Sequence, residues 1–136
     1  MTNPNLQTPS SKQAPITKIQ NGKQHDLEER SLQVAKDIGL FVNQLPRTIT
    51  NLEYGRQLVD TSGSVGANYI EANEALGKKD SMMRIKICRK EAKESGYWLK
   101  LIIETNGDRL REAGLKLLGE ATELRKLFPS ILAKSK

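Results

Sequence analysis

Apolar residues recur every three or four positions along four segments of the chain, which is the period of an amphipathic α-helix. The pattern predicts helices over residues 26–45, 50–76, 80–104 and 108–128. Pro46 ends the first segment, Gly77 ends the second, and Asn106-Gly107 forms the turn between the last two. Four helices of similar length joined by short loops pack in alternating directions. We therefore expect an all-α domain, an antiparallel up-down-up-down four-helix bundle.

Each predicted helix carries one apolar stripe that we expect to form the core. In the first two helices the stripes comprise Leu27, Ser31, Val34, Ile38, Phe41, Val42 and Leu45, then Tyr54, Leu58, Thr61, Ser62, Val65, Tyr69, Ala72 and Leu76. In the last two they comprise Ser81, Ile85, Cys88, Ala92, Ser95, Leu99 and Ile102, then Leu110, Gly114, Leu117, Ala121, Leu124, Phe128 and Ile131.

Local signals mark the expected helix ends. Asp26 is followed by two further acids. Negative side chains are stabilised near the positive N-terminal end of a helix dipole, so these residues indicate the start of the first helix. Thr50 with Glu53 forms a capping-box pattern, and Asp80 is the expected N-cap of the third helix. Pro129 predicts either a kink in the last turn of the fourth helix or a short extension after it.

The middle of the second helix is a run of small residues that includes Gly63 and Gly66. Each glycine inside a helix costs about 1 kcal/mol relative to alanine. We expect the close approach of another helix backbone, which small residues permit, to compensate for this cost. A break in the helix is the alternative.

The N-terminal segment, residues 1–25, is rich in Asn, Gln, Ser, Thr and Pro and shows no apolar period. Such a segment buries too little surface to offset the entropy lost on ordering, so we expect a disordered, weakly basic tail. The bundle is then expected over residues 26–132, with a basic C-terminal end at 133–136. The sole histidine, His25, lies at the end of the tail and is expected to be inert.

The charge balance favours a polyanionic partner. The chain has 22 Lys and Arg against 16 Asp and Glu, a net charge of +6. Solubility is the alternative reason for such a balance. A single cysteine fits a reducing compartment. No apolar run approaches the roughly 20 residues that cross a bilayer. We therefore expect a cytoplasmic protein without membrane contact.

The face of the third helix opposite its core stripe carries lysines and one tyrosine. The candidate nucleic-acid-binding residues are Lys79, Lys86, Lys90, Lys93, Tyr97 and Lys100. The five lysines fall within about 80° of one another on the helical wheel. Cations interleaved with an aromatic ring suit phosphate contact together with base stacking. The alternative is an ordinary solvated face, which lysines commonly fill.

The second and third helices each carry a further apolar stripe. A monomeric bundle needs one stripe per helix, so the second stripes predict self-association. The candidate interface residues are Val59, Ile70, Met83, Ile87, Trp98 and Leu101. The alternative is a broad core face that covers wide neighbours.

The side chains needed for catalysis or metal binding do not form a recognisable set. Glu91 with Glu94, and Glu71 with Glu74, have the spacing of a helical metal site but no histidine partner, so ion pairing is the expected role. Cys88 lies in a core stripe, where a small buried hydrophobe is expected. We expect no enzymatic activity, cofactor, metal or small-molecule substrate.

Two motifs resemble those of a known bacterial family. They are Arg56-Gln57-Leu58 with Ser62-Gly63-Ser64-Val65-Gly66-Ala67-Asn68-Tyr69-Ile70-Glu71-Ala72, and Lys78-Lys79-Asp80 with Cys88-Arg89-Lys90-Glu91-Ala92-Lys93-Glu94-Ser95 and Tyr97-Trp98-Leu99. The chain resembles, over roughly residues 26–132, the bacterial four-helix bundle proteins also called 23S rRNA intervening-sequence proteins. It is more distantly similar to the accessory bundle protein of diversity-generating retroelements, which binds nucleic acid and the reverse transcriptase.

The resemblance implies a left-handed four-helix bundle that assembles into a ring-shaped homopentamer. Members of the family are often encoded within insertions in large-subunit ribosomal RNA genes. Our hypothesis is a non-enzymatic, oligomeric protein that binds RNA or another nucleic acid through a basic face. The alternative is a structural or protein-interaction scaffold without a nucleic-acid role.

Overall fold

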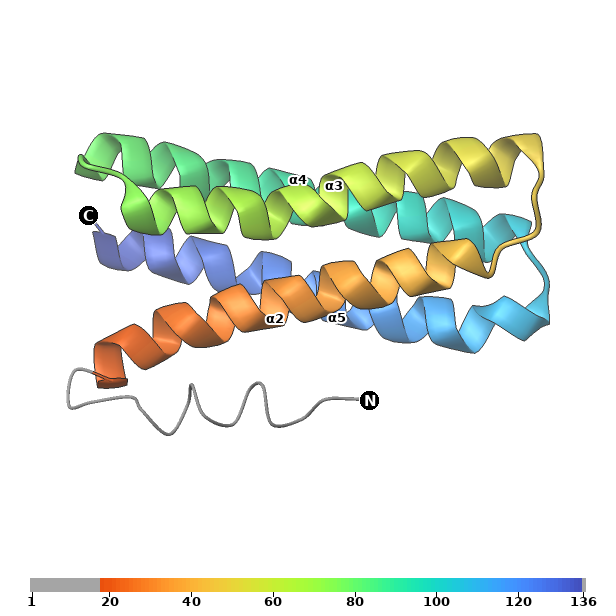
Figure 1. Cartoon of the computed structure of the whole chain (residues 1–136), viewed down its shortest axis with the longest axis horizontal. Helices are drawn as coiled ribbons and strands as arrows, with labels where there is room; N and C mark the ends of the chain where they lie inside the picture. Colours follow the sequence, from red (N-terminus) through yellow and green to blue (C-terminus); the bar gives the residue numbers. More distant parts are fainter. Residues whose placement is uncertain (1–17, 136) are drawn as a thin grey trace.

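Four α-helices make up the fold. The computed structural model describes residues 18–135, with side chains over 26–132 and at 134. Its helices are α2 (Lys18–Asn43), α3 (Ile49–Glu74), α4 (Lys78–Thr105) and α5 (Asp108–Ser135), and the described residues include no strand. Each helix runs antiparallel to the next along the chain, with α3 beside α4 and α2 beside α5 (Figure 1). This confirms the predicted all-α, up-down-up-down bundle.

Both terminal helices are longer than predicted. α2 begins at Lys18 rather than at Asp26. A nucleated helix gains one hydrogen bond for each residue added to it, and residues 18–25 contain no proline that would stop it. The rest of the predicted tail, residues 1–17, lies outside the described residues. α5 includes Pro129 and continues to Ser135, so it takes in most of the expected C-terminal end. The buried side chain of Leu132 packs this extension onto the core.

Two predicted helix caps are wrong. Thr48, not Thr50, caps α3, because its side chain accepts a hydrogen bond of 3.1 Å from the backbone N–H of Asn51. Glu53 therefore makes no capping box and instead accepts hydrogen bonds from Arg56 and Gln57. The N-cap of α4 is Gly77, and Asp80 lies inside the first turn of that helix.

The core follows the predicted stripes closely. Of their members, Val42, Tyr54, Ser81 and Ile131 are only half-buried, and Leu76 is fully exposed because α3 ends before it. The periodicity did not predict the buried positions Asn51, Gly55, Ile103 and Leu132. Asn51 is buried at the α3 start because its side-chain amide exchanges two hydrogen bonds of 2.9 Å with that of Asn106.

The small-residue run forms an unbroken part of α3, so the helix break is excluded. A Cβ atom at Gly66 would lie 3.3 Å from Cβ of Ser31 in α2, which confirms the predicted close approach. Gly63 differs, because a Cβ atom there would meet nothing within 4 Å among the described residues. Close approach therefore explains one of the two glycines and leaves Gly63 on the surface.

Candidate nucleic-acid interface

A basic groove of about 560 Å³ runs along the outer side of the seam between α4 and α5. Its lining consists of Lys86, Arg89, Lys90, Lys93, Arg125, Lys126 and Pro129. The four cations of α4 share one face because steps of three and four residues bring side chains back above one another. Antiparallel packing brings the last turns of α5 alongside them. We call these seven residues the basic groove.

The basic groove has six cations and no acidic residue in its lining. Two of the cations have an acidic neighbour, Lys90 at 3.5 Å from Glu91 and Lys126 at 3.8 Å from Glu123. The other four have no carboxylate oxygen within 4 Å among the side chains that the structure describes. Cations that line one concave surface reinforce each other's field, so this groove favours an anion with several charges.

Three of the predicted nucleic-acid-binding lysines meet in the basic groove, namely Lys86, Lys90 and Lys93. Lys79, Tyr97 and Lys100 are exposed on α4 but lie outside the groove lining. The sequence interpretation missed Arg89, which flanks the lysine stripe, and the two cations of α5. The consecutive pair Arg125-Lys126 was the available signal, but its position beside α4 depends on helix packing.

An aromatic cluster adjoins this surface. The ring of Tyr97 makes an edge-type contact with Trp98 at a centroid distance of 5.2 Å, and Trp98 packs against Tyr54 of α3 at 6.0 Å. Trp98 is half-buried, whereas 58% of Tyr97 is exposed. The cluster thus fixes an exposed tyrosine ring on the outer side of α4.

The candidate interface residues form two separate groups. Gly55 and Gly66 face α2, and Val59 and Ile70 each follow one of them by a turn, so this pair borders the α2 side of α3. The other group, on α4, comprises Met83, Ile87, Trp98 and Leu101 and lies on the flank where Trp98 meets α3. Val59, Ile70 and Met83 remain about half-exposed, and the other three are partly covered.

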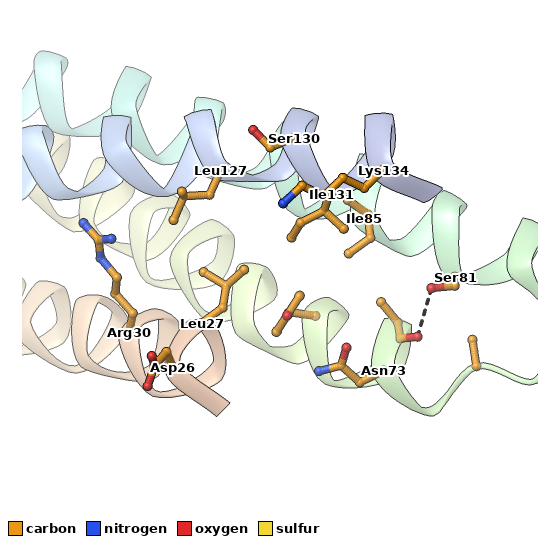
Figure 2. A pocket seen from close by; sticks show the side chains of 13 residues that line it. Asp26, Leu27, Arg30, Asn73, Ser81, Ile85, Leu127, Ser130, Ile131 and Lys134 are labelled. Atoms are coloured by element: carbon orange, nitrogen blue, oxygen red, sulfur yellow. Dashed lines mark hydrogen bonds between the residues drawn. The ribbon is translucent and has the colours of Figure 1, made fainter. Parts of the chain in front are cut away.

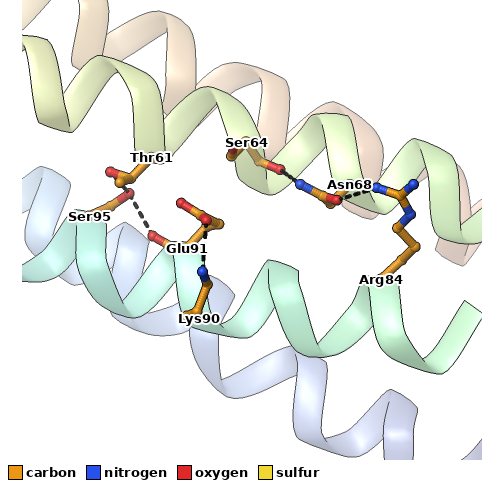
Figure 3. A network of polar contacts seen from close by, with 7 residues as sticks. All are labelled: Thr61, Ser64, Asn68, Arg84, Lys90, Glu91 and Ser95. Atoms are coloured by element: carbon orange, nitrogen blue, oxygen red, sulfur yellow. Dashed lines mark hydrogen bonds and ion pairs between the residues drawn. The ribbon is translucent and has the colours of Figure 1, made fainter.

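The seam between α3 and α4 contains a chain of polar contacts (Figure 3). The hydroxyl groups of Thr61 and Ser95 are hydrogen-bonded at 2.9 Å, and Ser95 also donates to the carbonyl of Glu91. The Glu91 carboxylate pairs with Lys90, its neighbour on the same helix, at 3.5 Å. These groups bind one another and hold the helices in register.

The seam also has a second link, in which Arg84 donates to Asn68 at 2.9 Å and Asn68 donates to the Ser64 carbonyl. Each polar side chain of this link thus has a partner within the bundle. The α3–α4 seam therefore acts as a structural contact.

The start of α2 diverges from the end of α5 (Figure 1). A larger cleft of about 860 Å³ lies there, lined by residues of all four helices (Figure 2). Apolar side chains such as Leu27 and Ile85 face it, and burial raises the pKa of Tyr69 on its wall. Its polar lining carries both signs of charge, with Asp26 as well as Arg30 and Lys134. A mixed rim of this kind does not favour a polyanion, in contrast to the basic groove.

The single thiol is confined to the core, as predicted. Cys88 has no exposed surface, and its Sγ donates to the Val65 carbonyl at 3.4 Å. Burial raises the pKa of this thiol to about 12, so it stays protonated and is a poor nucleophile at neutral pH. The side chain of His25 lies outside the described side chains.

The described residues contain no cluster of three or more His, Cys, Asp or Glu that could hold a metal ion. None of the described helices is long and apolar enough to cross a membrane.

A model of the 23S rRNA-intervening sequence protein family matches residues 23–129. A crystal structure of a protein with unknown function from the S23 ribosomal protein family, from Bacteroides thetaiotaomicron, shares 30% sequence identity. The alignment covers 78% of this chain and 97% of that one, with a TM-score of 0.66. No curated protein matches the sequence.

Proposed function

Because the chain belongs to the 23S rRNA-intervening sequence protein family, we propose that it binds RNA and that the basic groove receives the phosphate backbone. It acts by binding alone, without catalysis, in the cytoplasm. The observation that carries this proposal is the convergence of six cations from two helices on one concave surface without an acid in its lining.

The chemistry of the groove suits a chain of phosphates better than one isolated anion. Lys86, Lys90 and Lys93 succeed one another by about one helical turn, or roughly 5–6 Å between Cβ atoms. Successive phosphates of a strand can therefore each meet a cation. Arg89 and Arg125 add planar guanidinium groups, which bind phosphate oxygens through two parallel hydrogen bonds. Release of condensed counterions from the RNA then drives association.

Charge reversal in the groove tests this proposal. The triple variant Lys86→Glu, Lys90→Glu, Lys93→Glu is expected to bind RNA at least about tenfold more weakly, because repulsion replaces three phosphate contacts. Fluorescence anisotropy with a labelled RNA measures the affinity. Circular dichroism should show unchanged helicity, since all three side chains are exposed.

A matched control separates the groove from net charge. The variant Lys36→Glu, Arg47→Glu, Lys116→Glu also loses six units of charge, from exposed positions outside the groove lining. It is expected to retain most of the affinity. Equal losses in the two variants would remove the groove from the proposal, and a wild-type chain that binds no RNA would contradict RNA binding itself.

We also propose that the protein assembles into a closed ring, with a pentamer as the form implied by the family resemblance. The support is that the candidate interface residues form two different groups, one beside α2 and one on α4, and that Val59, Ile70 and Met83 among them are about half-exposed. When one surface of a chain binds an unlike surface of the next copy, the contact is heterologous, and its repetition closes a ring if the rotation between copies returns to the first one.

The variant Val59→Glu, Ile70→Glu tests this assembly. It is expected to reduce the mass measured by light scattering to that of the 15.2 kDa monomer, because two charges would be buried without partners. Both residues are about half-exposed in the single chain, so the fold tolerates the change.

The control variant Ile49→Glu, Leu76→Glu changes two apolar residues that are 88% and 105% exposed and belong to neither group. Its mass should equal that of the wild type. A wild-type protein that is monomeric at micromolar concentration would contradict the proposed ring.

A further inference from the structure

The seam between α4 and α5 changes character beyond the basic groove. On α4, Tyr97 follows Lys93 by one turn, and on α5 the face that carries Lys126 continues through Thr122 and Gly119 in steps of four and three. In this second half of the seam, Gly96, Tyr97, Leu115, Leu118, Gly119 and Thr122 are uncharged, and Lys100 follows Gly96 by one turn. The basic groove and a less charged stretch thus lie end to end along the same two helices.

Two glycines, Gly96 and Gly119, lie in this second stretch of the seam. A Cβ atom at Gly96 would lie 3.6 Å from the side chain of Leu118, so the two helices are in close contact there. A Cβ atom at Gly119 would meet nothing within 4 Å among the described residues. Neither glycine contributes a side chain here, which favours a flat group against the exposed ring of Tyr97.

Tyr97 presents an accessible ring face. In an edge-type contact one ring points its edge at the face of the other, so at least one face of Tyr97 is left free by Trp98. The half-buried Trp98, itself held against Tyr54, keeps the tyrosine in place. An exposed ring held in this way loses little entropy when a second ring stacks on it.

We infer that this site selects single-stranded RNA, with the backbone in the basic groove and one unpaired base stacked on Tyr97. The inference rests on the proposed function and adds the class of RNA to it. Tyr97 lies about 6 Å along the helix axis from Lys93, so a strand whose phosphate meets Lys93 brings its next base to the ring. In a duplex the base faces are covered by their neighbours, so no base face is available to stack on Tyr97.

The experiment compares two probes of the same sequence, a labelled single strand of about 12 nucleotides that cannot pair with itself and the duplex formed with its complement. Tyr97→Ala is expected to weaken binding of the single strand by at least about fivefold and to leave duplex binding unchanged. Tyr97→Phe keeps the ring and should bind the single strand within about twofold of wild type. Leu40→Ala is the matched control, a residue of similar exposure on α2 that belongs neither to the basic groove nor to the two candidate interface groups.

A second readout reports the stacking directly. Trp98 is the only tryptophan of the chain, and its ring centroid lies 5.2 Å from that of Tyr97. A base stacked on Tyr97 should therefore quench the fluorescence of Trp98. The single strand is expected to quench the emission, and the duplex at saturating concentration is expected to leave it unchanged.

The outcomes separate this inference from the proposed function. The selectivity for single strands is overturned if Tyr97→Ala binds the single strand as wild type does, or if its affinity for both probes falls equally. The charge-reversed groove variant tests RNA binding separately. If wild type binds neither probe, both ideas are overturned. Loss of the single strand alone, restored in Tyr97→Phe, supports the inference.

Discussion

Raising the salt concentration from about 50 to 200 mM is expected to weaken RNA binding by roughly 50- to 300-fold. Every phosphate that a protein cation neutralises releases counterions, and for a single strand the logarithm of the affinity falls by about 0.7 per phosphate for each tenfold rise in salt. The basic groove supplies six cations, of which Lys90 and Lys126 already have a carboxylate neighbour. Between four and six phosphates therefore set the slope, at about −2.8 to −4.2.

Titrations of a labelled single strand at several salt concentrations measure this slope. The variant Lys86→Glu, Lys90→Glu, Lys93→Glu should lose about two units of it, since three phosphate contacts disappear. The control Lys36→Glu, Arg47→Glu, Lys116→Glu should keep the wild-type slope. A wild-type slope near zero would mean that RNA binding, if observed, does not depend on the groove cations.

Truncating Phe128 to alanine is expected to lower the free energy of unfolding by about 3–5 kcal/mol. The side chain has no exposed surface, and its ring lies 6.1 Å from that of Tyr69 across the bundle. It also precedes Pro129, which removes a backbone hydrogen bond from the interior of α5. The contacts of Phe128 therefore stabilise both the core and the end of the helix that supplies Arg125 and Lys126 to the groove.

Urea denaturation followed by circular dichroism measures this loss. The neighbouring Leu127 is 37% exposed, and its truncation to alanine should cost about 1 kcal/mol or less. If the two variants are equally stable, Phe128 does not hold the end of α5. A loss of this size is a large fraction of the roughly 5–15 kcal/mol that stabilise a typical domain. If it partly unfolds α5, the circular dichroism spectrum of the Phe128→Ala variant without urea should show reduced helicity.

Most core positions were predictable because burial in a helical bundle follows a local period. Ile38, Leu58, Leu99 and Phe128 all lie on the predicted stripes and are fully buried. The period could not place Asn51, whose burial comes from an amide pair with Asn106, a residue 55 positions away. Nor could it place Leu76, which shares the stripe of α3 but falls beyond the end of that helix.

The candidate site was predictable only on the helix that carries the lysine stripe. Lys86, Lys90 and Lys93 were found because side chains on one helix face share a spacing in the sequence. Arg125 and Lys126 could not be assigned to the same surface, since their place beside α4 depends on how far the two antiparallel helices slide along each other. Two glycines of the same run in α3 also differ in a way that the sequence does not show. Gly66 packs on Ser31, whereas a Cβ atom at Gly63 would meet nothing within 4 Å among the described residues.

The sequence by itself determined four amphipathic helices, their antiparallel order, the composition of the core and the excess of positive charge. These properties depend on periodicity, on turn residues and on counts, all of which are local or additive. The tertiary structure decided which cations converge in the basic groove, where the helix caps lie and which ring face stays open beside Trp98. These features depend on the register between helices, which is fixed by the packing of side chains that are distant in the sequence.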